Sequence, residues 1–126
     1  RVDRDAAHRV FSVIATAGVN MSKYLISVFY TADGAMGLRK DGGTKRREVV
    51  RKALASVGGK LESFYFCLGD QDAVVIADLP DAVAAASLSV AISATGAVRL
   101  VTTPLLTPED MDKAAGKKTA YKAPGK

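Results

Sequence analysis

Alternating and periodic apolar positions divide the chain into strands and helices from Met21 onward. Runs rich in β-branched and aromatic residues predict four strands, at residues 24–31, 60–68, 73–79 and 98–105. Apolar residues three and four apart predict a helix at residues 45–57, capped by Thr44. Pro80-Asp81 predicts the start of a second helix, capped by Asp81, which runs to about residue 95 and ends at Gly96. The order β-α-β-β-α-β is the split β-α-β arrangement of an α+β domain, which is called ferredoxin-like.

Turn signals complete this outline. Asp41-Gly42-Gly43 interrupts the chain, so residues 32–38 predict only a short helical turn. The polar segment 69–72 is short enough to join its flanking strands as an antiparallel hairpin. Pro104 indicates an edge strand, and Thr107-Pro108 predicts the start of a short last helix.

The expected strands carry apolar side chains on both faces. In the first strand Tyr24, Ile26, Val28 and Tyr30 alternate with Leu25, Ser27 and Phe29. In the second, Phe64, Phe66 and Leu68 alternate with Leu61, Tyr65 and Cys67, and in the third, Val74 and Ile76 alternate with Ala73, Val75, Ala77 and Leu79. Two helices cover only one face of such a sheet. We therefore expect the other face to pack on a second copy of the chain, as in a homodimer.

Composition and charge narrow the function classes. The chain has 126 residues, enough for one domain, and no apolar run long enough to span a membrane. Its net charge of +5 comes mainly from five lysines in residues 113–126, whereas residues 21–112 are close to neutral. This distribution favours a solubilising tail over a nucleic-acid arm. We expect a leader at 1–20 that is non-native or flexible, a domain at 21–112 and a basic tail at 113–126.

Four segments resemble the GYD-domain family: MSKYLISVFYT, GGKLESFYFCLGDQD, VVIADLPD and AVRLVTTPLLTPED. The resemblance covers about residues 21–116. The family's name-giving element is a glycine, a spacer, a tyrosine and an aspartate. Gly69, Asp70 and Asp72 fit this element, with Gln71 in place of the tyrosine. The resemblance implies a dimeric α+β barrel of unknown function. The wider superfamily includes cofactor-independent monooxygenases and isomerases.

Few residues suit a metal or nucleophilic site. His8 is the single histidine and Cys67 the single cysteine, so we expect no metal, no haem or other cofactor, and no Ser-His-Asp arrangement. One cysteine forms no intramolecular disulfide, which fits a reducing cytoplasm. Lys45, Arg46 and Arg47 beside a helix start would suit an anion, but a solvated basic face is the favoured interpretation.

The candidate ligand-binding residues are Tyr24, Tyr30, Tyr65, Asp72 and Arg99. Each also has a structural interpretation: core or interface packing for the tyrosines, a turn hydrogen bond for Asp72, and an ion pair with Asp78 or Glu62 for Arg99. Two hypotheses follow. The favoured one is a non-catalytic homo-oligomeric domain that binds a small apolar or aromatic molecule. The alternative is a cofactor-independent monooxygenase or isomerase, so whether the chain is an enzyme is left open.

Overall fold

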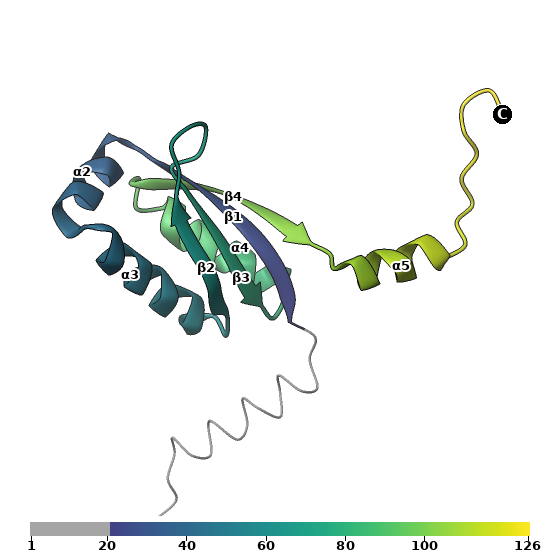
Figure 1. Ribbon diagram of the computed structural model, residues 1–126, viewed down its shortest axis with the longest axis horizontal. Coiled ribbons are helices and arrows are strands. Elements are labelled where there is room, and N and C mark those ends of the chain that lie inside the picture. The colour runs from purple at the N-terminus through teal and green to yellow at the C-terminus, as the bar shows by residue number, and fades with distance from the viewer. Residues whose placement is uncertain (1–20) are drawn as a thin grey trace, which may run out of the picture.

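A computed structural model describes residues 21–126 (Figure 1), and the expected leader at 1–20 lies outside the described residues. The elements are β1 (Ser22–Tyr30), α2 (Ala32–Asp41), α3 (Gly43–Ser56), β2 (Lys60–Phe66), β3 (Ala73–Leu79), α4 (Ala82–Ser93), β4 (Val98–Leu105) and α5 (Pro108–Gly116). The strands form one antiparallel sheet in the order β2-β3-β1-β4. The predicted ferredoxin-like α+β fold is confirmed, and β4 is an edge strand as Pro104 indicated.

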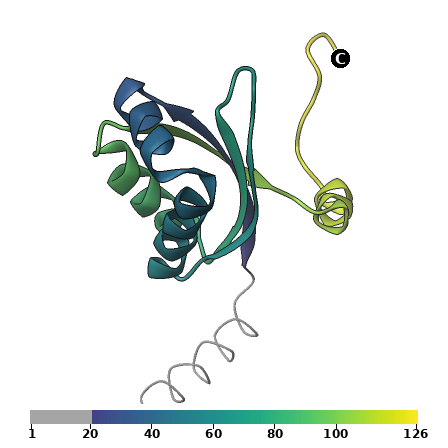
Figure 2. The same ribbon diagram turned by 60° about the vertical axis from the view of Figure 1, so that its left-hand side comes forward.

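The helices α3 and α4 lie on the same face of the sheet, which makes a two-layer domain (Figure 2). The core fills the space between these layers. It includes Ile26 and Val28 from β1, Val75 and Leu79 from β3, and Leu54 from α3. Leu54 and Leu79 are completely buried, so they anchor the helix layer to the sheet.

The segment after β1 differs from the prediction, because α2 is a ten-residue helix and not a short turn. The Thr31 hydroxyl accepts a hydrogen bond from the Gly34 N–H at 3.3 Å and so caps this helix. Gly42, with φ of 82°, ends α2, and α3 begins directly at Gly43. The predicted cap at Thr44 is therefore wrong, because the N-cap position belongs to Gly42, which has no side chain to donate or accept.

Strand β2 contains an irregularity that the alternating pattern does not reveal. Leu61 is opposite Ala77 and Ser63 is opposite Ile76, so Glu62 is the extra residue of a bulge. The extra residue places Leu61 and Phe64 on the same face, where both pack on the core. The prediction that Leu61 lies opposite Phe64 is wrong for this reason.

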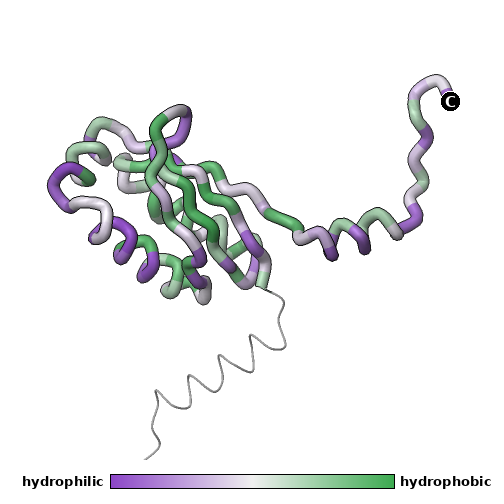
Figure 3. The backbone as a smooth tube through the Cα atoms, in the orientation of Figure 1, coloured by the Kyte–Doolittle hydropathy of each residue, from purple (hydrophilic) through white to green (hydrophobic). Residues whose placement is uncertain are grey.

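The second face of the sheet is covered by none of the helices α2, α3 and α4. It presents seven apolar side chains: Leu25, Phe29, Tyr65, Val74, Ile76, Val101 and Leu105. Figure 3 shows long hydrophobic (green) stretches along the strands, whereas hydrophilic (purple) and hydrophobic positions alternate along α3. Helix α5 extends from the end of β4 toward this side of the sheet and has no buried residue (Figure 2). Within residues 21–126, no helix has the length and apolar character to cross a bilayer.

Candidate functional site

A groove separates α3 from α4 above the inner face of the sheet. Its volume is about 560 Å³, and its walls include Ala53 and Val57 from α3 and Ser87 and Ala91 from α4. Most residues of α4 are alanine or serine. Because these side chains are short, they do not reach α3, and the space between the two helices stays open as a groove.

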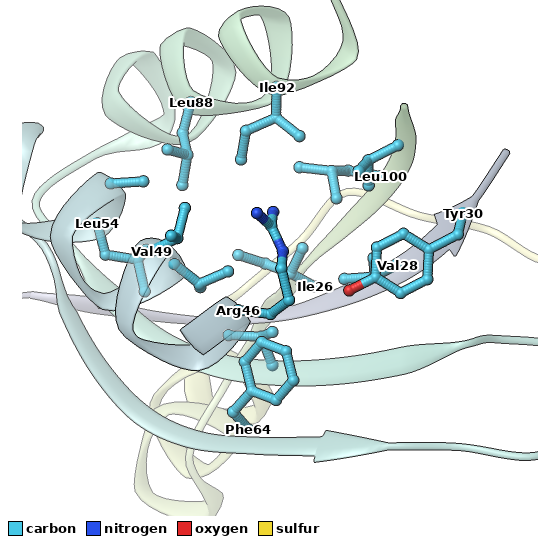
Figure 4. A pocket seen from close by; sticks show the side chains of 14 residues that line it. Ile26, Val28, Tyr30, Arg46, Val49, Leu54, Phe64, Leu88, Ile92 and Leu100 are labelled. Atoms are coloured by element: carbon cyan, nitrogen blue, oxygen red, sulfur yellow. The ribbon is translucent and has the colours of Figure 1, made fainter. Parts of the chain in front are cut away.

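Beneath the groove lies a smaller cavity of about 80 Å³ (Figure 4). The sheet forms its floor through Ile26, Val28, Val75 and Leu100, and Phe64 closes one end. The cavity and the groove share lining residues from both helices, so we treat them as one continuous site, with the cavity as its deeper part. An apolar floor below a more polar mouth is typical of small-molecule sites.

Arg46 lies in the first turn of α3 and lines both the groove and the cavity. It precedes Val49 by three residues, Val50 by four and Ala53 by seven, which places it on the apolar stripe of the helix. Figure 4 shows its guanidinium directed into the cavity, toward the side chains of α4. The interpretation of Arg46 as part of a solvated basic face is therefore wrong, since its side chain is only 27% exposed.

The partners of this guanidinium are weak. Within residues 21–126 its one ion pair is with Asp41, at an N–O distance of 3.8 Å, which is longer than a hydrogen bond. Asp41 also lies 3.6 Å from the Lys45 ammonium group. The Arg46 guanidinium group therefore lies near the cavity without a carboxylate at hydrogen-bond distance.

Tyr30 supplies a second polar group, at the end of β1. Burial of the ring raises the pKa of its phenol, the nearby Arg46 guanidinium partly offsets this rise, and Asp72 adds to it. The phenol is therefore neutral at physiological pH and can donate a hydrogen bond. A third hollow of about 90 Å³, beside α2, is lined by Tyr30, Arg46 and Val98. Arg46 and Val98 line all three spaces, so the guanidinium lies where they meet.

The five predicted candidates do not come together. Tyr30 is the one that lines the cavity, whereas Tyr24 is buried in the core and is not among the lining residues. Tyr65 is 68% exposed on the uncovered face of the sheet. Asp72 lies before β3, where its carboxylate accepts a hydrogen bond from the Tyr30 N–H at 2.8 Å and its own N–H donates to the Val28 carbonyl at 2.9 Å. Asp72 therefore forms hydrogen bonds that connect the β2–β3 hairpin to β1, and not the expected hydrogen bond within the turn.

Arg99 also lies on the uncovered face, where its guanidinium stacks 4.1 Å from the centre of the Phe29 ring. The expected ion pair with Asp78 or Glu62 is wrong, because both carboxylates bind Lys23, each at 2.9 Å. Lys23 lies near the start of β1, whereas Arg99 of β4 is paired with Phe29 near the end of β1. The two cations therefore lie toward opposite ends of this face.

The turn between β2 and β3 carries the glycine and aspartate residues of the motif, with Gly69 and Asp70 exposed. A model of the GYD domain matches residues 24–115, which include β3 and β4 entirely and nearly all of β1 and α5. The chain belongs to the GYD domain family. This GYD domain matched no curated protein and no solved structure in the corresponding comparisons. Family membership agrees with the fold, but the chemistry of the site has to be argued from its residues.

Sequence patterns pointed to the aromatic residues and missed Arg46. The signal was present, because a charged residue in register with Val49, Val50 and Ala53 lies on the face that a helix turns to the core. The polar groups assembled here are one guanidinium, one neutral phenol and the hydroxyls of Ser56, Ser87 and Thr95. Such groups hold and orient a bound molecule. No group of three or more metal-ligating side chains occurs in the part of the chain that the structure describes.

Proposed function

We propose that this GYD domain binds a small apolar or aromatic molecule in the groove between α3 and α4. The observation that carries the proposal is the continuity of the groove with the apolar cavity below it, which exposes the inner face of the sheet to a ligand. A molecule seated there would replace water against Val49, Ile92 and Leu100. Removal of this apolar surface from water favours binding by about 25 cal/mol per Å² before the costs of association.

A titration with a neutral aromatic probe tests this proposal. We expect benzyl alcohol to shift the methyl resonances of Leu88, Ile92 and Val98 in NMR spectra, because these residues line the site. Ala53→Leu should weaken the binding by filling the space where α3 meets the cavity. Ala55→Leu is the matched control, because Ala55 is exposed on the same helix. Shifts of these methyls that are equally strong in both variants, or no shifts at all, would contradict the proposal.

The alternative of a cofactor-independent monooxygenase or isomerase has less support. That hypothesis requires tyrosine, aspartate and arginine side chains to converge on one substrate. Tyr65 and Arg99 lie on the uncovered face, whereas Tyr30 lies on the helix side. Asp72 is engaged by the backbone of β1. This separation of the candidate groups favours a non-catalytic binding domain.

A second proposal concerns the uncovered face of the sheet, for which we propose a second copy of the chain as the partner. The face combines apolar residues, of which Val101 is 43% and Tyr65 68% exposed, with charged groups at both ends. Helix α5 extends on the same side, so a second copy can contact both the sheet and this helix (Figure 2). A twofold axis lets each copy cover the other's face, which supports a dimeric barrel.

The single cysteine, Cys67, supports a reducing compartment such as the cytoplasm.

Sedimentation velocity of the full chain tests this assembly. At micromolar concentration we expect a dimer, and we expect Val101→Glu to shift it to the monomer by placing unpaired carboxylates in the interface. Met36→Glu is the control, because Met36 is 70% exposed but belongs to α2, on the helix side. A folded monomer for the unsubstituted chain would refute this assembly.

A further inference from the structure

We infer that the ligand of this groove is a small monocarboxylate with an apolar body, and that the Arg46 guanidinium binds its carboxylate. The inference rests on the proposed binding in the groove and adds the chemical class of the ligand. Its starting point is the position of Arg46, whose charged end is directed among the side chains of Leu88, Ile92 and Leu100 (Figure 4). A cation in such surroundings loses much of its hydration and gains most from an anion that replaces the lost water.

The geometry of the guanidinium favours a carboxylate over a spherical anion. Arginine presents a planar fork of N–H groups, which pairs with the two oxygens of a carboxylate through parallel hydrogen bonds. Asp41 does not occupy this fork, since the ion pair is 3.8 Å long, and it shares its charge with Lys45. An incoming carboxylate can therefore bind at hydrogen-bond distance without displacing a strong internal partner.

Tyr30 offers a second donor for the same group. Its hydroxyl oxygen is directed toward the cavity that the Arg46 side chain enters (Figure 4). A phenol has an ordinary pKa of about 10, which burial raises here, so the Tyr30 O–H is present at neutral pH and can donate to one carboxylate oxygen while the guanidinium holds both. Two converging donors fix the head of the ligand at the end of the site near α2.

The remaining lining indicates a single charge and a compact apolar body. Arg46 is the one charged side chain in the lining of the cavity and of the groove. The neighbouring cations Lys45, Arg47, Arg51 and Lys52 are exposed and line neither space. A polyanion such as a nucleotide would leave its additional charge uncompensated beside apolar walls. The cavity of about 80 Å³ suits a short alkyl group or part of one aromatic ring, with the rest of the ligand in the groove.

Isothermal titration of the full chain with phenylacetate and with phenylacetamide tests the inference. The two probes have nearly the same shape and differ in charge. We expect phenylacetate to bind about tenfold more tightly or better, which is the size expected for hydrogen bonds to charged groups. Arg46→Gln should abolish this preference, because it removes the positive charge that distinguishes the two probes. Arg47→Gln is the matched control, because Arg47 is exposed in the same turn, and it should keep the preference.

The outcomes of this titration distinguish the specificity for a carboxylate from the binding of a small molecule in the groove. Equal affinity for both probes, or a preference that survives Arg46→Gln, would overturn the carboxylate assignment while the proposed binding function stands. Failure of both probes to bind the unsubstituted chain would overturn the binding function itself. Arg46→Lys keeps the charge and loses the planar fork, so it should retain only part of the preference. This variant provides the same test if Arg46→Gln does not fold.

Discussion

Gly34 illustrates how one residue fixes the position of a helix. A Cβ at this position would overlap with the Ala97 carbonyl oxygen and lie 3.0 Å from a carbon of the Tyr30 ring. The same carbonyl oxygen accepts a hydrogen bond from the Thr31 N–H at 3.0 Å, so it is not free to move. We expect Gly34→Ala to lower the free energy of unfolding by about 1–3 kcal/mol through overpacking, as measured by urea denaturation.

A matched substitution in the same helix should act in the opposite direction. A Cβ at Gly37 meets no atom within 4 Å, and the backbone there is helical. Gly37→Ala is therefore expected to raise the free energy of unfolding by about 0.5–1 kcal/mol through helix propensity and reduced freedom of the unfolded chain. A similar loss in both variants would show that steric exclusion at Gly34 is not the cause.

The titration of Tyr30 reports on its distance from Arg46. Burial raises the pKa of the phenol above its ordinary value of about 10, and the guanidinium limits this rise. Arg46→Gln should therefore raise the pKa of Tyr30 further, whereas Arg47→Gln should leave it unchanged. The measurement is the pH dependence of the Tyr30 ring carbon resonances. A decrease of this pKa in Arg46→Gln would contradict the geometry of the site.

The same pKa determines how Tyr30 affects stability in alkaline solution. Below pH about 10 the phenol is neutral in the folded and the unfolded chain, so its contribution to stability is complete. Above this value the unfolded chain ionises first, because its pKa is lower. The free energy of unfolding should therefore fall as pH rises toward the pKa of the folded state, and this part of the loss should be absent in Tyr30→Phe. Thermal denaturation between pH 9 and about 11 compares the two proteins.

Elements differ in how much of their structure the sequence determines locally. The bounds of β3 and β4 follow from alternation and turn residues alone, and the structure has the predicted ranges. The bulge at Glu62 depends on how β2 pairs with β3, and no feature within residues 60–66 distinguishes it from regular alternation. Helix α2 contains two glycines and so has weak propensity, and its N-cap residue Thr31 is hydrogen-bonded to Ala97, 66 residues later in the chain.

The helix caps allow a test at the same scale. The Asp81 carboxylate accepts a hydrogen bond from the Ala84 N–H at 2.8 Å and caps α4, which packs on the core. Thr44 was the predicted cap of α3 but lies inside that helix. Asp81→Ala should cost about 1 kcal/mol of unfolding free energy, and Thr44→Ala should cost much less. Chemical denaturation of both variants compares them, and equal losses would contradict the assignment of the caps.

On the scale of the whole molecule, the groove is the feature that sequence patterns did not predict. Periodicity identifies which face of α3 is apolar, but it does not specify how far this helix lies from α4. That spacing depends on the packing of α3 on β2 and of α4 on β4, with short side chains on α4 between them. Arg46 was visible in register with the apolar stripe, yet its role follows only once the open space beside it is known.

The projection of α5 gives a prediction for the complete assembly. Residues 107–126 contain no buried side chain, and the capping box of Thr107 and Asp110 holds α5 without help from the core. In the proposed dimer this arm lies beside the second copy, where Met111, 54% exposed, can pack. Removal of residues 107–126 should therefore weaken the dimer at least tenfold in sedimentation equilibrium, because it removes apolar contacts with the partner. The same deletion should leave the unfolding of the dissociated chain nearly unchanged. A loss of stability in the monomer would instead mean that the arm packs on its own sheet, and an unchanged dimer would restrict the interface to the strands.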